Sequence, residues 1–266
     1  MGAALARAAL ARGDRVAGTA RRAEDAGAFT ALAPGRAFGL VMDLTDEATI
    51  QAGCAQAEAM LGGIDILVNN AGYGLVGAVE EVSLAEARAQ FEVNVFGPLA
   101  VLKAVLPFMR ARRAGHVINV TSVSGLATWA GTGIYCASKF ALEGLGETLA
   151  QEVAELGIRV THIEPGGMRT DYAGRSLVHA AQTLADYDGL ARDARRILAE
   201  HAGQEPGDPE RAAQAILRVA GAPDAPLHLL LGADAHHYAL RKLDALRAEI
   251  DQWTAVTLDV GFEPAD

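Results

Sequence analysis

Short apolar runs that alternate with segments of helical spacing are the feature that most constrains how this chain folds. The runs lie at about residues 15–20, 36–42, 64–69, 115–121, 158–164 and 227–231. Parallel strands need long crossover connections, and the helices in those connections cover both faces of the sheet. The pattern therefore predicts an α/β fold: a Rossmann-like doubly wound parallel sheet in three α/β/α layers, formed as one domain over residues 1–266.

Composition excludes several classes of function. The net charge of −10 is spread along the chain without a basic stripe, which argues against nucleic-acid binding. Two cysteines make no disulfide framework, and we find no signal peptide and no apolar run long enough to span a bilayer. We therefore expect a cytoplasmic protein without a membrane partner. The adjacent pair His236 and His237 faces two directions on a helix and has no third ligand nearby, so we expect no metal site.

The clearest chemical signal is a tyrosine and a lysine four residues apart, Tyr135 and Lys139. Positions i and i+4 lie on the same face of a helix, so the ammonium group lies near the phenol. A nearby positive charge favours the phenolate and lowers the pKa of the tyrosine, which suits it to proton transfer. Ser122 follows an apolar strand upstream, on the sheet edge where α/β proteins bind ligands, and is placed to hold a substrate oxygen.

These residues, with Asn94 in the run Asn-Val-Phe-Gly, resemble the motifs of the short-chain dehydrogenase/reductase family over nearly the whole chain. The resemblance implies interconversion of a carbonyl and an alcohol by an NAD(P)-dependent oxidoreductase. Ser122 would hold the oxygen, Tyr135 would exchange the proton, Lys139 would hold the nicotinamide ribose, and Asn94 would hold a water that extends the proton relay. It also implies a strand order of 3-2-1-4-5-6-7 and a homodimer or homotetramer that acts on a small molecule.

The same resemblance assigns the cofactor site. An acidic residue at the end of the second strand would bind the ribose 2′-hydroxyl of NAD, but this chain has Ala20 followed by Arg21 and Arg22. Arginine suits a 2′-phosphate, so we expect NADP rather than NAD. Asp43 would accept from the adenine or cap the following helix. The expected contacts are Gly2, Arg21, Arg22, Asp43, Leu44, Asn70, Ala71, Gly72, Tyr135, Lys139, Pro165, Gly166 and Thr170.

The beginning and the last third of the chain carry the remaining expectations. Gly2 matches only the last glycine of the family's Gly-rich turn, so we expect the first, central strand to be missing and Met1 to be an artificial start. A non-catalytic Rossmann protein that has lost cofactor binding is the alternative this leaves open. Residues 171–206 correspond to the family's substrate lid, or to an amphipathic helix packed on the sheet. Residues 234–266 form a C-terminal extension without a chemical motif.

Overall fold

The computed structural model describes residues 1–262 except 171–175, 190–192, 194–195, 198–199 and 201. In this part of the chain, strands and helices alternate as the sequence predicts, and every strand pair is parallel. The strands are β1 (Val16–Ala20), β2 (Ala37–Val41), β3 (Ile66–Asn69), β4 (Gly74–Val76), β5 (Gly115–Val120), β6 (Ile158–Pro165), β7 (Leu177–His179) and β8 (His228–Leu231). The helices are α1 (Gly2–Arg12), α2 (Ala23–Thr30), α3 (Glu47–Leu61), α4 (Leu84–Phe91), α5 (Gly97–Arg112), α6 (Gly133–Val153), α8 (Pro209–Ala220), α9 (Ala233–Gln252) and α10 (Thr254–Leu258).

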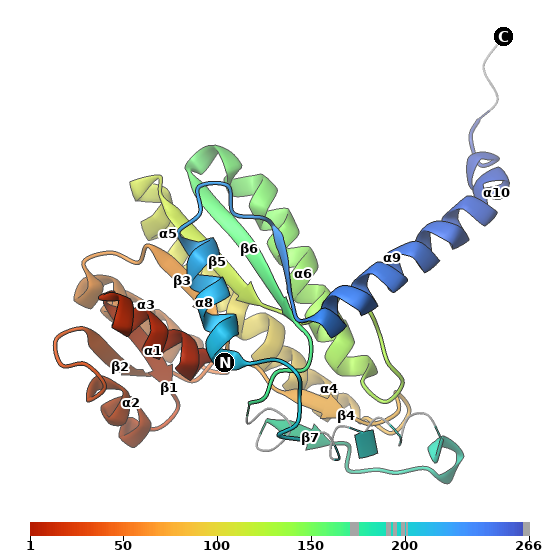
Figure 1. Ribbon diagram of the computed structural model, residues 1–266, viewed down its shortest axis with the longest axis horizontal. Helices are drawn as coiled ribbons and strands as arrows, with labels where there is room; N and C mark the ends of the chain where they lie inside the picture. Colours follow the sequence, from red (N-terminus) through yellow and green to blue (C-terminus); the bar gives the residue numbers. More distant parts are fainter. Residues whose placement is uncertain (171–175, 190–192, 194–195, 198–199, 201, 263–266) are drawn as a thin grey trace.

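The main sheet divides into two parts. One contains β1 and β2, and the other has the order β3-β5-β6-β8. The expected family order with its first strand left out gives this arrangement, and among the described residues no strand pairs with the facing edges of β1 and β3. The expectation that these two strands lack a common neighbour is therefore confirmed. Figure 1 shows the β1–β2 pair beside the larger part of the sheet.

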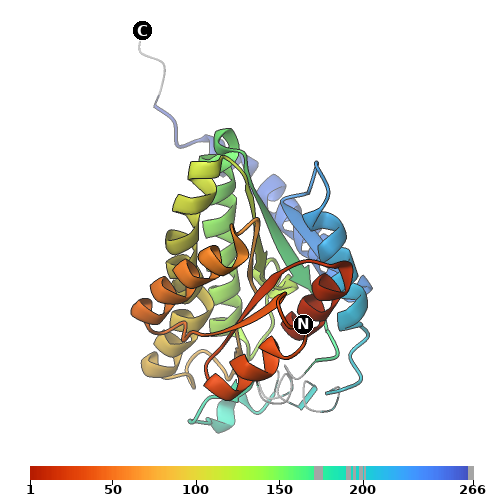
Figure 2. The same cartoon turned by 90° about the vertical axis from the view of Figure 1, so that its left-hand side faces the viewer.

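Two apolar clusters cover the two faces of the sheet, because neighbouring residues of a strand point to opposite sides. On β5, Val117 faces the cluster made with α3, α5 and α6, whereas Ile118 faces the one made with α1 and α8. Figure 2 shows these helices on both sides of the strands. The three-layer α/β/α architecture is confirmed, and the carboxyl ends of β3, β5 and β6 lie at the same edge of the sheet.

The helical segment Leu84–Arg112 contains a π-helical turn, η1 (Glu92–Phe96), between α4 and α5. The sequence predicts a kink or break here because of Pro98 and Pro107. Pro98 directly follows this π-helical turn, at the beginning of α5, and α5 continues through Pro107. By length and composition alone this segment could cross a membrane, because an 18-residue window of it has a mean hydropathy of 1.4. The sequence-based statement that no run is long enough was wrong on length and composition, although α5 packs its apolar side on the core.

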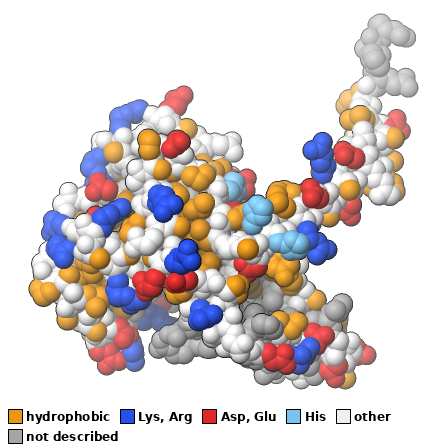
Figure 3. All heavy atoms as spheres, viewed as in Figure 1, with side chains coloured by type: hydrophobic (Ala, Val, Ile, Leu, Met, Phe, Trp, Pro, Cys, Tyr) orange, Lys and Arg blue, Asp and Glu red, His pale blue; other side chains and the backbone are white. Residues whose placement is uncertain are grey.

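Residues 171–206 lie partly outside the described residues. Of the rest, β7 pairs with β4, and a short 3₁₀ turn, η4 (Ala185–Tyr187), brings the Tyr187 hydroxyl within 2.6 Å of Glu80 Oε2, to which it donates. The sequence analysis missed both β4 and β7. The C-terminal extension forms α9 and α10, which project away from the body of the protein (Figure 1), and Figure 3 shows the same arm with its side chains.

Candidate active site

Helix α6 carries Tyr135 and Lys139 on one face, one turn apart. The ammonium group of Lys139 lies 5.8 Å from the centre of the Tyr135 ring and donates to the carbonyl oxygen of Val120, at the end of β5, over 3.1 Å. Lys139 is buried, and this burial lowers its pKa to about 8, while the Glu143 carboxylate one turn further along opposes the shift. A cation held this close to a phenol favours its ionised form.

Asn94 connects the loop after β3 to α6. It lies in η1, is 1% exposed, and exchanges two hydrogen bonds with the backbone of Tyr73: Oδ1 accepts from the Tyr73 N–H at 3.1 Å and Nδ2 donates to the Tyr73 oxygen at 3.0 Å. Nδ2 also donates to Ser138 Oγ at 3.1 Å, and this hydroxyl donates to the carbonyl oxygen of Tyr135 at 2.7 Å. The side chain of Asn94 thus fixes the positions of two segments of the site.

Ser122 lies just beyond β5, as expected. Its Oγ accepts from the Ser124 N–H at 3.0 Å and donates a long hydrogen bond of 3.4 Å to the carbonyl oxygen of Pro165. Pro165 is the last residue of β6, so the hydroxyl lies where the ends of two neighbouring strands meet. The structure therefore brings Ser122 and Pro165 together at the ligand-binding edge of the sheet.

The residues expected to receive the cofactor phosphates also lie together. A Cβ atom on Gly2 would lie 2.5 Å from Asn70 Nδ2, so the beginning of α1 approaches the loop after β3 closely. This helix has no acidic residue in its first turn and no side-chain cap, which leaves backbone N–H groups for an anion. A Cβ on Gly72 would lie 3.1 Å from Asn94 Oδ1 and 3.6 Å from Lys139 Nζ. Ala71 is exposed beside it.

The two arginines after β1 differ in their partners. Arg22 is bound to Asp25 through two hydrogen bonds of 2.7 and 2.9 Å and lies 2.7 Å from Glu24, so it stabilises the start of α2. Arg21 makes no side-chain hydrogen bond with the described part of the chain. It is exposed and lies near the carboxylate of Asp43.

Asp43 does not cap the helix that follows it. Its Oδ1 accepts from the backbone N–H and the hydroxyl of Thr45 at 2.9 and 2.8 Å, which lowers its pKa, and Asp46 is the N-cap of α3. The helix-cap alternative was therefore wrong, because the turn through Thr45 places the cap three residues later. Leu44 packs against Gly97, because a Cβ atom added to Gly97 would lie 2.8 Å from the Cβ of Leu44.

Two of the expected contacts after β6 have close neighbours. Gly166 faces the Asp234 carboxylate, because a Cβ atom added to Gly166 would lie 2.3 Å from its oxygens. The same carboxylate accepts a hydrogen bond from the Gly167 N–H at 2.7 Å. Thr170 donates from Oγ1 to the carbonyl oxygen of Met168 over 3.4 Å, and residues 171–175 that follow lie outside the described residues. The cofactor roles of both stay predictions.

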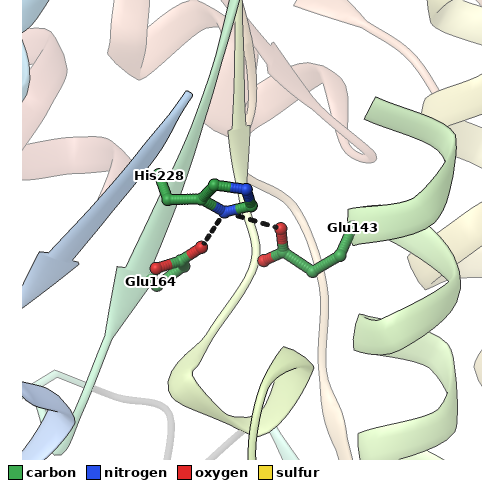
Figure 4. A group of neighbouring side chains, drawn as sticks. All are labelled: Glu143, Glu164 and His228. Carbon is green, nitrogen blue, oxygen red and sulfur yellow. Dashed lines mark hydrogen bonds and ion pairs between the residues drawn. The ribbon is translucent and has the colours of Figure 1, made fainter. Parts of the chain in front are cut away.

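Sequence reasoning missed several residues that build the site. Ser138 and Tyr73 give no sequence signal, because their contacts to Asn94 join segments far apart in the chain. The group formed by the buried Glu143 and Glu164 and the exposed His228 was also missed (Figure 4). Its only sequence signal is that Glu143 continues the four-residue spacing of Tyr135 and Lys139 on α6.

Comparison with known proteins agrees with this geometry. The family model of short chain dehydrogenases matches residues 1–179. An oxidoreductase of Botryotinia fuckeliana, BOA17, is 36% identical over 260 residues, which cover 97% of this chain and 94% of the relative. A short-chain dehydrogenase from Streptomyces avermitilis has a TM-score of 0.91 at 40% identity and covers 98% of this chain and 94% of its own. A metagenomic short-chain oxidoreductase in complex with NADP has a TM-score of 0.66 at 28% identity, with 86% and 90% covered.

The fold and the site define an NAD(P)-dependent oxidoreductase. The chain belongs to the short-chain dehydrogenase family. The alternative of a non-catalytic binding protein is not favoured, because Ser122, Tyr135 and Lys139 lie at the same edge of the sheet and the relatives are oxidoreductases.

Proposed function

We propose that this protein interconverts a small-molecule carbonyl and its alcohol with NADP(H). The observation that carries the proposal is the buried Lys139 beside the ring of Tyr135, on the sheet edge that also holds Ser122. When bound, the cofactor supplies or accepts the hydride. At Gly2 and Gly72 a side chain would meet Asn70, Asn94 and Lys139, so glycine lets the backbone approach these residues closely where the cofactor would bind.

In this proposal each side chain handles one atom of the reaction. Ser122 Oγ holds the substrate oxygen, and the Tyr135 hydroxyl gives it a proton in reduction or takes one in oxidation. The Lys139 ammonium group favours the phenolate form of Tyr135. The side-chain amide of Asn94 already makes hydrogen bonds with Tyr73 and Ser138. A water that relays protons beyond Lys139 would therefore bind to the backbone of η1 rather than to this amide.

The tyrosine tests the proposal directly. In Tyr135→Phe the proton donor is lost and the ring packing is kept, so NADPH-dependent reduction across a panel of ketones and aldehydes should fall by at least about 10²-fold. Tyr238→Phe is the matched control, because its ring is 40% exposed on α9 and lies edge-on against Trp129, and this variant should keep full activity. Comparable turnover in Tyr135→Phe and the wild type would remove Tyr135 from the mechanism.

The NADP preference rests on Arg21. An arginine paired to a 2′-phosphate adds a charge-assisted contact, so Arg21→Ala should weaken NADPH binding by about 1.5–3 kcal/mol and NADH binding much less. Arg22→Ala is a sharp control, because the Arg22 guanidinium is already bound to Asp25 and Glu24. Isothermal titration of both cofactors measures the difference. Equal weakening of NADPH and NADH by Arg21→Ala would contradict the preference.

We also propose that the protein is a homo-oligomer and cytoplasmic. The arm formed by α9 exposes Leu243, Leu246, Ile250 and Trp253 at positions i, i+3, i+7 and i+10, which form one apolar stripe. If a second copy covers this stripe, Ile250→Glu should lower the mass in light scattering, whereas Ala248→Glu on the opposite face should not. An unchanged mass for both variants would contradict the role of the arm.

The buried free thiols of Cys54 and Cys136 suit a reducing compartment and support the proposed cytoplasmic location, which cell fractionation tests.

A further inference from the structure

Three ionisable side chains from separate elements meet behind the proposed active site (Figure 4). Glu143 comes from α6, Glu164 from β6 and His228 from β8, and one ligand atom of each lies within 4.8 Å of the others. Residues two apart on a strand share a face, so Glu164 and His162 point to the same side of β6. His228 is opposite His162 in the neighbouring strand, and α6 covers this side of the sheet.

The hydrogen bonds in this group are too few for its buried oxygens. His228 Nδ1 lies 2.7 Å from Glu164 Oε1 and 3.7 Å from Glu143 Oε2. The side chain of Glu164 is fully buried, yet its Oε2 has no hydrogen-bond partner among the described residues, and the same holds for both oxygens of Glu143, which is 3% exposed. Thr121 is close to Glu143, but its hydroxyl donates to the carbonyl oxygen of Ile163 at 3.0 Å. Buried polar atoms are normally satisfied, so this group is incomplete.

The charges point the same way. Two buried carboxylates share one imidazole, and a third carboxylate, Glu147, lies 4.0 Å from His228 Nε2 at the rim. Lys139 lies one turn before Glu143 on α6 and donates to the carbonyl oxygen of Val120. Burying two neighbouring carboxyl groups is unfavourable unless a cation or protons offset their charge. A cation bound between them would offset it and would also give the unpaired oxygens a partner.

We propose that Glu143, Glu164 and His228 bind one divalent transition-metal ion, best matched by Zn²⁺. Carboxylate oxygens with an imidazole nitrogen are a common zinc ligand set, whereas Mg²⁺ prefers oxygens alone. The His228 side chain is 41% exposed, so the ion has a path from solvent. His162 Nδ1 lies 3.2 Å from Glu143 Oε2, so its ring borders the proposed ligand set.

Such an ion would connect the sheet to the helix that carries the reacting groups. Glu143 lies one turn beyond Lys139 on α6, and Glu164 directly precedes Pro165, the acceptor of the Ser122 hydroxyl. The proposed metal site does not include the reacting atoms, and metal binding there is an addition to the oxidoreductase activity. The ion fixes α6 against β6 and β8, and we expect it to act on stability first.

Metal titration of the full-length protein tests the proposal without an activity assay. After treatment with a chelator and its removal, calorimetric titration with ZnCl₂ should show one ion per chain with a Kd of about 1 μM or tighter, and MgCl₂ should bind far more weakly. Zinc at about 100 times its Kd should also raise the melting temperature by roughly 5 °C or more. A crystal grown with zinc should show anomalous scattering between the three side chains.

Variants separate this site from other zinc-binding groups. His228→Gln is the main variant, because the His228 side chain is 41% exposed and its replacement leaves the buried core unchanged, and it should weaken zinc binding by at least about 10²-fold. Glu164→Gln should do the same, and the optical spectrum of bound Co²⁺ gives a second measurement of the ligand set. His237→Gln, on the exposed surface of α9, should have no effect. Absence of binding by the wild type, or zinc binding unchanged in His228→Gln and Glu164→Gln, would overturn the proposal in favour of carboxyl groups that share protons.

Discussion

The buried amide of Asn94 offers a prediction whose size follows from the structure. Asn94→Ala removes two hydrogen bonds to the Tyr73 backbone and one to Ser138 Oγ. The carbonyl oxygen of Tyr73 keeps a partner, because Gln90 Nε2 also donates to it at 2.9 Å, but the Tyr73 N–H loses the acceptor that Asn94 provides.

A buried donor without a partner costs about 1–3 kcal/mol, and each lost hydrogen bond adds about 1 kcal/mol. Removing buried side-chain atoms also leaves a cavity. We therefore expect Asn94→Ala to lower the free energy of unfolding by about 3–5 kcal/mol. Turnover should fall as well, since Tyr73 follows the cofactor-facing Gly72 and Ser138 bonds to the backbone of Tyr135.

Urea unfolding followed by circular dichroism measures the loss of stability. The control is Gln151→Ala, an exposed amide on α6 with one long hydrogen bond of 3.4 Å, which should change stability by less than about 0.5 kcal/mol. Ser138→Ala and the double variant complete a mutant cycle, in which the coupling should be about 1 kcal/mol. A loss below about 1 kcal/mol for Asn94→Ala, or no coupling to Ser138, would refute the argument that this amide holds the two segments together.

Three further predictions address other parts of the chain. Gly72→Val places a branched side chain against Asn94 and Lys139, so turnover should fall by roughly 10²-fold in steady-state assays. An unchanged rate would show that the loop after β3 moves to accommodate the side chain. Burial lowers the pKa of His116 to about 4, so between about pH 6.5 and pH 4 the unfolded chain binds a proton that the folded protein does not. His116 alone should lower stability by roughly 2–3 kcal/mol over this range, and since burial also lowers the pKa of His162 to about 4, His116→Gln should remove part of the drop in urea titrations at several pH values. Asp46 accepts from two N–H groups at the start of α3, so Asp46→Ala should cost about 1 kcal/mol in the same unfolding assay, and a neutral result would contradict its role as the cap.

The sequence predicted the parts of the site that depend on local geometry. Tyr135 and Lys139 had to share a helix face because of their spacing, and Ser122 had to lie at a strand end because it follows an apolar run. The asparagine pair after β3 was also predicted to connect neighbouring strands, and Asn69 does so by donating to Asn119 Oδ1 on β5 at 2.9 Å. These properties follow from chain periods of 3.6 and 2 residues, which a sequence displays directly.

Other features of the site needed the tertiary structure, because they join residues that are distant along the chain. The different partners of Arg21 and Arg22 depend on how α2 begins, and the clamp from Asn94 to Ser138 spans 44 residues. The Glu143, Glu164 and His228 group forms only when two parallel strands and α6 pack together. Local spacing determined which residues carry the chemistry, whereas long-range packing decided how they are held and which buried charges are left to be neutralised.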